Sequence, residues 1–270
     1  MLLTKKKKIK NAVQLWQECF NDSVEWIEDY FSIFNAENNL HCIYKNENLV
    51  SMLMAAEYNW RYNNNILPFI YLSGVCTKKQ LRNQGLSSSL IKNVLLKSYT
   101  NGKMFCGLIV ANEDLKEFYK KFGFVSLNFN EEKTIFKKQK YSPNEIHQMF
   151  ENGIFSKIDN SVIHNSKTLS LYSEKHYETV DCSSNRRMQM FRIINAEEVL
   201  KLYAKKFPEK ELVFELKDQV FRKNNQVFSI QRSRVSSQKS NENTNIKKIS
   251  IEELTSIIFQ DAYMFLMNER

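Results

Sequence analysis

The sequence has no long apolar run, although 43% of its 270 residues are hydrophobic. A membrane-spanning helix needs roughly 18 or more consecutive apolar residues, and no segment approaches that length. A secretion signal is also missing, because the lysines at positions 5–8 are followed closely by the polar Asn11 and not by an apolar stretch. We therefore expect a cytoplasmic protein with no membrane partner.

Cysteine and histidine are scarce and scattered. The chain has five cysteines and four histidines. The cysteine number is odd, no two have Cys-x-x-Cys spacing, and no histidine lies at ligand spacing from one of them. This pattern argues against a disulfide framework and against a metal site. We predict reduced cysteines in the core and no metal; the cysteines are Cys19, Cys42, Cys76, Cys106 and Cys182.

The chain is basic, with a net charge of +9 and a pI of about 9.1. A basic chain suits nucleic acid, but it equally suits a small polyanion such as a nucleotide diphosphate. Apart from positions 5–8 the lysines are spread along the sequence, and no RNA-binding or helix-turn-helix motif is found. Nucleic acid is therefore the least favoured partner.

Apolar spacing predicts alternating helices and strands over the first half of the chain. Helices are expected at 11–20, after a cap at Ser23, at 86–96 and at 115–121, the last ending at Gly123. Strands are expected at 41–44, 49–56, 69–76, 105–110, 124–129 and 134–136. Helices that lead into a largely consecutive sheet with two crossover helices predict an α/β or α+β layer fold.

The character of the sequence changes after residue 140. A short helix can begin at Ser142, and the stretch 165–187 is polar with weak periodicity. A second unit begins near Met188, with a helix capped by Asn195, strands at 212–217 and 227–231, a loose loop at 233–245, and a helix capped by Ser250. About eighty residues make a small core, so this unit is expected to pack on the first.

The segment Arg82-Asn-Gln-Gly-Leu-Ser87 lies between the predicted strand 69–76 and the predicted helix 86–96. A strand, a polar loop with a glycine and a helix form the layout of a backbone anion cradle. The glycine permits close approach of the chain to a ligand, and the helix N-terminus presents free N–H groups to a phosphate.

A second motif follows one strand later. Residues 112–124 read Asn-Glu-Asp-Leu-Lys-Glu-Phe-Tyr-Lys-Lys-Phe-Gly-Phe. Arg82-x-x-Gly85-x-Ser87 resembles the Gln/Arg-x-x-Gly-x-Gly/Ala signature of the GNAT superfamily of N-acetyltransferases. Asn112 with the Tyr119-x-x-x-Gly-Phe segment resembles that family's second motif. The two motifs, in this order and separated by a strand, are more specific than either alone. The resemblance covers roughly residues 10–140.

The resemblance implies acetyl-coenzyme A as the acyl donor and no metal. Tyr119 matches the family's tyrosine that protonates the departing thiolate, and Asn112 would orient the cofactor arm. Arg82 would add charge at the mouth of the loop, and Ser87, in place of the usual glycine or alanine, would offer its hydroxyl to a phosphate. Backbone groups would pair with the pantetheine arm at Val75, Cys76 and Thr77, and would hold the pyrophosphate at Asn83, Gln84, Gly85, Leu86, Ser87 and Ser88.

Each of these residues also has a structural interpretation. Gly85 is compatible with an ordinary turn, and Arg82 with a solvated charge. Tyr119 lies in an aromatic stripe at helical spacing, which is more often core than catalytic site. Glu113, Asp114 and Glu117 are compatible with a base, but beside lysines they favour a solvated face.

A closer resemblance is to the Eis-like acetyltransferases of bacteria. It is carried by Leu15-Trp-x-x-Cys-Phe-Asn-Asp-Ser, by Tyr71-Leu-Ser-Gly-Val-Cys-Thr77 and by the hydrophobic pattern of the C-terminal unit, which is similar to a sterol-carrier-protein-like domain. This predicts a GNAT domain at 1–140, a linker or reduced second GNAT-like segment at 141–186, and a small α+β sterol-carrier-protein-like domain at 187–270. In that group the terminal carboxylate serves as a base, and here the chain ends with the charged Arg270.

The resulting hypothesis is an N-acetyltransferase that moves an acetyl group from acetyl-coenzyme A to a primary amine by direct attack. A module that binds acyl-coenzyme A without turnover is the alternative. The sequence does not identify the small-molecule or peptide amine, and it leaves open whether the chain forms a homo-oligomer.

Overall fold

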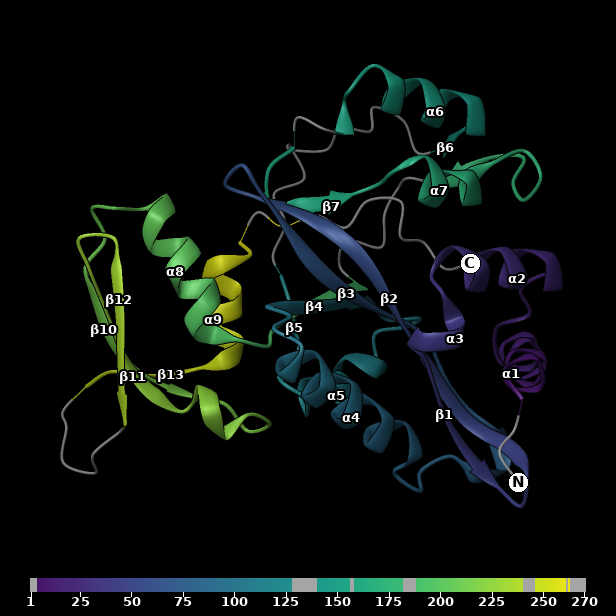
Figure 1. Cartoon of the computed structure of the whole chain (residues 1–270), viewed down its shortest axis with the longest axis horizontal. Coiled ribbons are helices and arrows are strands. Elements are labelled where there is room, and N and C mark those ends of the chain that lie inside the picture. Colours follow the sequence, from purple (N-terminus) through teal and green to yellow (C-terminus); the bar gives the residue numbers. More distant parts are fainter. Residues whose placement is uncertain are drawn as a thin grey trace.

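The computed structural model describes residues 4–127, 140–155, 158–181, 188–239, 246–260 and 262. A seven-stranded mixed sheet with helices on both faces forms the centre of the molecule (Figure 1). Its main path runs β1-β2-β3-β4-β9-β5, and β7 pairs with β2 beside this path. The predicted α/β or α+β layer fold is confirmed, and its sheet is mixed and flanked by helices.

The helices are α1 Lys5–Phe20, α2 Val24–Ile33, α3 Ala36–Asn39, α4 Leu86–Thr100, α5 Leu115–Lys120, α6 Pro143–Glu151, α7 Ser166–Leu169, α8 Ala196–Lys206 and α9 Ile251–Ile258. The strands of the central sheet are β1 Leu40–Lys45, β2 Asn48–Tyr62, β3 Asn65–Thr77, β4 Phe105–Ile109, β5 Val125–Ser126, β7 Ser161–Ile163 and β9 Gln189–Ile193. The other strands are β6 Lys140–Tyr141, β8 Val180–Asp181, β10 Leu212–Lys217, β11 Gln226–Gln231, β12 Arg234–Lys239 and β13 Lys248–Ser250.

Helix starts follow the predicted caps. The side chains of Ser23, Ser142, Asn195 and Ser250 each accept a hydrogen bond from a backbone N–H of the first helical turn. Such caps satisfy donors that have no partner inside the helix. Local sequence therefore fixes where α2, α6, α8 and α9 begin.

Strand β3 separates the two hydrophobic cores of the central region. Phe69 and Tyr71 belong to the core that includes α1 and α2, whereas Ile70 and Leu72 belong to the core with α4 and α5. This alternation is the two-residue period of a strand that is buried on both faces. The same strand thereby connects the two helical layers.

The strand next to β4 comes from far along the chain. β9 pairs antiparallel with β4 over five residues and with β5 over Val125 and Ser126. The predicted unit from residue 187 onward includes residues 189–193, and the structure places them in the central sheet, where Met190, Phe191 and Ile193 are buried. The domain limits stay a prediction. The pairing of β9 favours a boundary between the first and the second unit after Ile194.

The middle segment, residues 140–181 in its described parts, extends the central sheet. β7 pairs with Asn59, Trp60 and Arg61 of β2, and Trp60 Nε1 donates to Asn160 Oδ1 at 3.1 Å. The fully buried Trp60 ring lies among Phe69, Phe105 and Phe191. This segment therefore shares its core with the main sheet.

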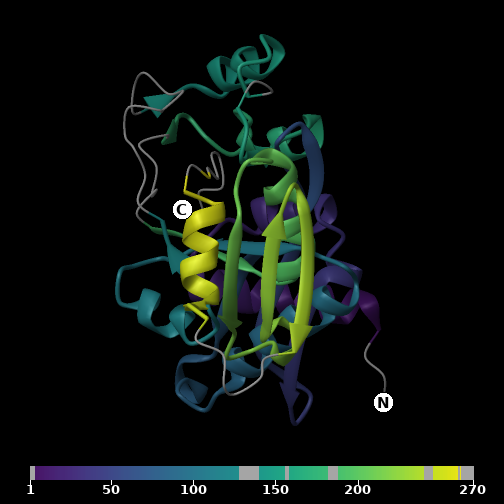
Figure 2. The same cartoon turned by 90° about the vertical axis from the view of Figure 1, so that its left-hand side faces the viewer.

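The C-terminal unit, the described residues between 195 and 260, contains α8, α9 and a four-stranded sheet ordered β12-β11-β10-β13. Figure 2 shows this sheet from the front with α9 alongside it. Helix α9 packs on β9 and β5 on one side and on β13 on the other. β12 corrects the predicted loose loop at 233–245, because its polar side chains lie on an exposed edge strand that has no apolar alternation.

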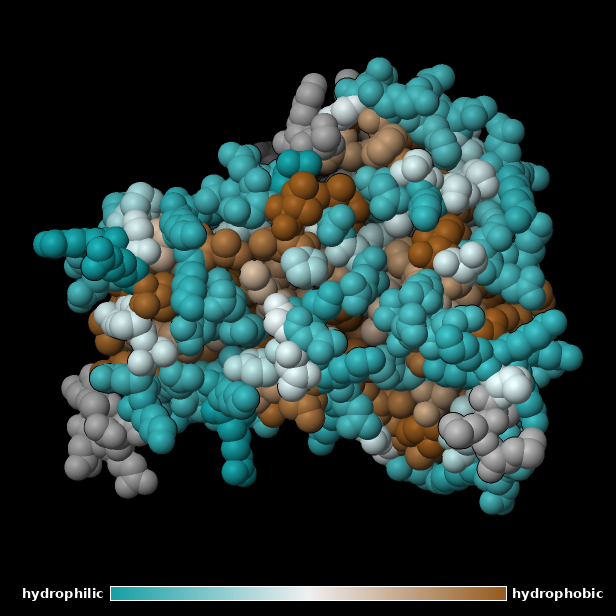
Figure 3. All heavy atoms as spheres, viewed as in Figure 1, coloured by the Kyte–Doolittle hydropathy of each residue, from teal (hydrophilic) through white to brown (hydrophobic). Residues whose placement is uncertain are grey.

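The surface is largely hydrophilic, and hydrophobic side chains form separate patches on the face shown in Figure 3. Among the described residues, no helix has both the length and the apolar character needed to cross a bilayer.

Candidate active site

A cavity of about 720 Å³ lies where β3, the following loop, α4 and α5 meet the end of α1. Its lining contains Tyr119, Asn112 and most of the predicted cofactor-binding residues. The lining residues are Cys19, Phe20, Val75, Cys76, Thr77, Leu81, Arg82, Asn83, Gly85, Leu86, Ser87, Ser88, Ala111, Asn112, Leu115, Phe118, Tyr119 and Lys121.

The cavity begins where two parallel strands part. β3 and β4 pair only from Phe69 to Tyr71 on β3, yet β3 continues to Thr77. The last residues of β3, from Val75 to Thr77, line the cavity, as do Ala111 and Asn112 just after β4. A strand edge that no neighbouring strand covers offers backbone N–H and C=O groups to a ligand.

A bulge shapes this end of β3. Between the pairs Met52–Cys76 and Met54–Ser73 the register shifts, so β3 contains one extra residue there. Gly74 lies in the extra stretch with φ +55°, and a Cβ atom on it would come within 2.1 Å of the Trp16 ring. Only glycine fits both requirements.

The loop after β3 ends in an uncapped helix N-terminus. Gly85 is the N-cap of α4, with φ +76°, and it provides no side-chain cap for the first N–H groups of the helix. Asn83 is also left-handed, with φ +61°. The first-turn N–H groups of α4 and the positive end of its dipole thus face the cavity, an arrangement that favours an anion.

Hydroxyl groups fix the loop to the sheet. Thr77 Oγ1 is 2.7 Å from Ser87 Oγ and 2.8 Å from Ser51 Oγ, and the hydroxyl of Ser51 donates to the carbonyl of Cys76 at 2.9 Å. Arg82 Nε donates to the carbonyl of Thr77 at 3.2 Å. The hydroxyl of Ser87, expected to contact a phosphate, is therefore engaged within the protein and connects α4 with β3.

Tyr119 lies on α5 at the cavity, with 7% of its surface exposed. Its ring contacts Phe118 and Phe124 with centroid distances of 5.0 and 6.1 Å. Asn112 Oδ1 accepts from the N–H of Leu115 at 3.3 Å, so it supports the start of α5. The core and the site interpretations of Tyr119 are therefore compatible.

Gln84 is the one predicted site residue that does not line the cavity. Its Oε1 accepts from Lys45 Nζ at 3.0 Å on the exposed side of the loop. A cofactor-binding role for Gln84 stays a prediction and would involve its backbone only.

Helix α1 contributes residues that the motifs did not indicate. Cys19 and Phe20 lie in its last turn and line the cavity. A hydrogen bond with Cys76 lowers the pKa of the Cys19 thiol to about 7, Arg82 acts in the same direction, and partial burial opposes both. The pKa of Cys76 is raised well above its usual value by the same hydrogen bond and by burial. No local pattern links Cys19 to the end of β3.

The charged side chains of the lining are both cations, Arg82 and Lys121. Its described residues include no aspartate, glutamate or histidine. Within the part of the chain that the structure describes, no group of three or more histidine, cysteine or acidic residues is arranged to hold a metal. The cavity is thus suited to a polyanion.

Comparisons of the chain with a family model and with solved structures agree with the mixed α/β fold described above. Residues 3–126 match the family model of the acetyltransferase (GNAT) domain. No curated protein matches the chain. Among solved structures, a probable N-acyltransferase from Enterococcus faecalis has a TM-score of 0.66 at 13% identity, over 93% of this chain and 87% of that one.

Two further structures extend this likeness. A GCN5-related N-acetyltransferase from Anabaena variabilis has a TM-score of 0.61 at 12% identity, over 93% of this chain and 87% of that one. Eis1 from Mycobacterium abscessus has a TM-score of 0.61 at 9% identity, over 96% of this chain and 88% of that one. At these identities the likeness concerns the fold alone. Residues 3–126 thus carry the sequence pattern of a GNAT acetyltransferase domain, within a chain whose fold is that of GNAT-related structures.

Proposed function

We propose that the protein transfers an acetyl group from acetyl-coenzyme A to a primary amine. The observation that carries this proposal is the single cavity that joins an uncapped helix N-terminus, an uncovered strand edge and a buried tyrosine. These three features suit the pyrophosphate, the amide-containing arm and the thioester of the donor, in that order. The GNAT domain match over residues 3–126 supports the same reaction class.

The chain's own groups then divide the work. First-turn N–H groups of α4 bind the pyrophosphate, and Arg82 and Lys121 add positive charge at the cavity. Backbone groups of Val75, Cys76 and Thr77 pair with the pantetheine arm. The hydroxyl of Tyr119 gives its proton to the thiolate that leaves when the amine nitrogen bonds to the carbonyl carbon.

None of the described lining residues is a carboxylate or an imidazole, the side chains that most often serve as the base for an acceptor. The carboxylate of Arg270 was considered for this role, and Arg270 lies outside the described residues. We therefore propose that the amine enters the cavity neutral, and that the proton its nitrogen loses as the amide forms passes through water and restores the hydroxyl of Tyr119.

Replacing Tyr119 by phenylalanine tests the proposal. Tyr119→Phe should lower kcat by about 10²–10⁴-fold, the range of a lost general acid, with little change in the Kd for acetyl-coenzyme A. Tyr99→Phe is a matched control, because Tyr99 lies on α4 outside the cavity and packs against Phe221. An unchanged kcat in Tyr119→Phe across the pH range would remove the proposed role of Tyr119.

A second candidate is a module that binds acyl-coenzyme A without turnover. The lack of a carboxylate or imidazole among the described lining residues favours it. Calorimetry with coenzyme A, followed by transfer assays on a broad panel of amines, separates the two functions. Tight binding with no transfer to any amine would favour the module over the enzyme.

A further inference from the structure

An ion pair buried completely between the central sheet and the C-terminal unit lies close to the helix that carries Tyr119. Arg192, on β9, and Asp218, just after β10, both have side chains with no exposed surface. Arg192 Nη2 donates to both carboxylate oxygens of Asp218 at 2.8 Å. Both oxygens are reached by the same nitrogen, so the carboxylate holds the Nη2 end of the guanidinium and leaves Nη1 for another acceptor.

Asp218 is itself held in place by hydrogen bonds from three neighbouring groups. Its Oδ1 accepts from the N–H groups of Val220 and Phe221 at 2.8 and 3.1 Å, and its Oδ2 accepts from Asn224 Nδ2 at 2.8 Å. The guanidinium of Arg192 also lies over the Phe221 ring, 4.9 Å from its centroid. The turn after β10 therefore fixes the Nη2 end of the Arg192 guanidinium.

The other end of the guanidinium reaches the turn after α5. Arg192 Nη1 donates to the carbonyl of Phe122. The next residue, Gly123, has φ +78°, and a Cβ atom there would come within 1.8 Å of Arg192 Nη1. Glycine at this position thus allows the left-handed turn and also leaves space for the guanidinium.

This turn is bonded directly to Tyr119. The N–H groups of Phe122 and Phe124 donate to the carbonyl of Tyr119 at 2.9 and 3.4 Å. A fixed Phe122 carbonyl therefore fixes the last turn of α5. The depth of the Tyr119 ring in the cavity depends on that turn, because α5 has only six residues.

We propose that Arg192, held by Asp218 of the C-terminal unit, is a positioning residue for Tyr119. The C-terminal unit contributes no described residue to the cavity lining, and through this contact it sets the geometry of the proton donor. The inference rests on the proposed function, because it takes the hydroxyl of Tyr119 as the group that must be placed.

The test combines two variants with a matched control. Arg192→Lys keeps the positive charge but loses the planar guanidinium with its two Nη donors. Asp218→Asn keeps the shape of the side chain but loses its negative charge. Thr255→Val is the control, since Thr255 Oγ1, on α9, accepts from the N–H of Ile193 at 3.3 Å and connects the same two parts without touching Phe122. If Arg192→Lys does not fold, Asp218→Asn decides the outcome.

Kinetics supply the first measurement. Arg192→Lys should lower kcat by about 10–100-fold, as a small misplacement of a reacting group does, with the KM for acetyl-coenzyme A changed less than threefold. In a Tyr119→Phe background the same substitution should have almost no further effect. An equal loss in both backgrounds, or an equal loss in Thr255→Val, would overturn the positioning role.

A second measurement does not depend on activity. The ring signal of Tyr119 in ¹³C-tyrosine NMR spectra, assigned by its loss in Tyr119→Phe, should shift in Arg192→Lys and Asp218→Asn but not in Thr255→Val. If the wild-type protein transfers acetyl to no amine, the proposed function fails and this signal alone decides the positioning. An unshifted signal in both variants would refute it.

Discussion

The cavity and the C-terminal unit use polar groups in opposite ways. All described lining residues of the cavity lie between Cys19 and Lys121, and their polar atoms are partly open to solvent and to a ligand. The C-terminal unit instead supplies half of an ion pair that is completely buried. Groups that must bind a ligand are left available, whereas both Nη atoms of Arg192 and both carboxylate oxygens of Asp218 have partners within the protein.

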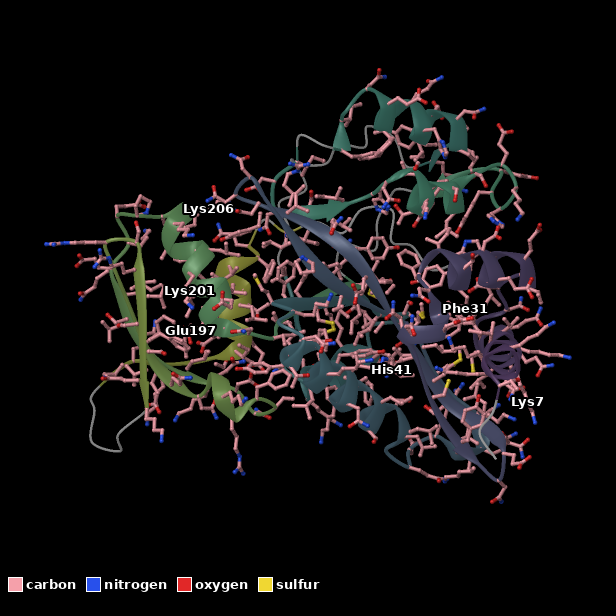
Figure 4. All side chains as sticks on the ribbon, viewed as in Figure 1. Lys7, Phe31, His41, Glu197, Lys201 and Lys206 are labelled. Atoms are coloured by element: carbon pink, nitrogen blue, oxygen red, sulfur yellow. The ribbon has the colours of Figure 1, made fainter. Side chains whose placement is uncertain are left out.

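Two ion pairs join the C-terminal unit to the rest of the molecule, and they differ in how deeply they are buried. Lys206, at the end of α8 near the β2–β3 hairpin (Figure 4), is 2.9 Å from Asp159, with side chains 27% and 42% exposed. The Arg192–Asp218 pair has no exposed surface. Exposed pairs contribute little because solvent screens them, whereas a buried charge that loses its partner is costly.

The largest predicted effect breaks the buried pair from either side. Arg192→Met or Asp218→Leu alone should lower the free energy of unfolding by about 3–5 kcal/mol, because each leaves a buried charge unpaired. Lys206→Ala removes the partly exposed pair and the contact of Lys206 Nζ with the Tyr62 ring, 4.7 Å from its centroid, and should cost about 1–2 kcal/mol. Urea denaturation measures all three variants, and similar losses for Asp218→Leu and Lys206→Ala would contradict the comparison.

The double variant sharpens the same comparison. Arg192→Met with Asp218→Leu should be less destabilised than the sum of the single variants, because no unpaired charge is left in the junction. A strictly additive loss would mean that packing, and not charge, is what the pair contributes.

A smaller effect is predicted for glycines with similar backbone angles and different surroundings. Gly74 packs its Cα against the Trp16 ring at the cavity, Gly123 lies against Arg192 at the junction, and Gly102 has φ +71° with no atom within 4 Å of a built Cβ. Gly102→Ala should cost about 1 kcal/mol from backbone strain alone. Gly74→Ala and Gly123→Ala should cost at least about 2 kcal/mol, because a ring or a guanidinium must also move.

The prediction for the glycines is checked in an Arg192→Met background. In that background the cost of Gly123→Ala should fall but stay above that of Gly102→Ala, because Ile251 Cγ2 also lies 2.9 Å from the built Cβ, while the cost of Gly74→Ala should not change. Thermal or urea unfolding of the paired variants measures the difference. Equal costs of Gly123→Ala in both backgrounds would show that Arg192 does not restrict the turn.

The sequence predicted those features that depend on near neighbours. The caps at Ser23, Ser142 and Ser250 each involve residues three positions apart, and the loop at Gly85 lies between a strand and a helix that apolar spacing indicates well. Local signals therefore located most of the cavity residues as well.

Long-range pairing was not predictable in this way. β9 reaches β4 across the whole middle segment, and any apolar strand would satisfy the same pattern. Arg192 in the apolar stretch 188–194 signals a buried partner, but 30 acidic residues compete for that role in the sequence alone. The contact of Cys19 with Cys76 likewise depends on how α1 packs on β3, which no motif records.

The smallest expected effect concerns the reactivity of Cys19 at the cavity and not the free energy of unfolding. The pKa of Cys19 is lowered to about 7, so about half of its thiol is ionised at neutral pH, whereas burial raises the pKa of Cys42 to about 11. Alkylation of Cys19 by iodoacetamide should therefore rise through pH 7 and level off near pH 8, while Cys42 stays unreactive over that range.

Cys76→Ala tests the cause of the lowered pKa. The hydrogen bond with Cys76 is the largest contribution to the lowered pKa, so its removal should raise the pKa of Cys19 and slow alkylation at pH 7 by about fivefold for the first unit of pKa and about tenfold for each further unit. Bound acetyl-coenzyme A should protect Cys19 in the wild-type protein, because Cys19 lines the same cavity as the loop at 82–88. Protection that rises in proportion to ligand occupancy would place the thiol at the ligand. An alkylation rate that is unchanged both in Cys76→Ala and with ligand would mean that the end of α1 does not close the cavity.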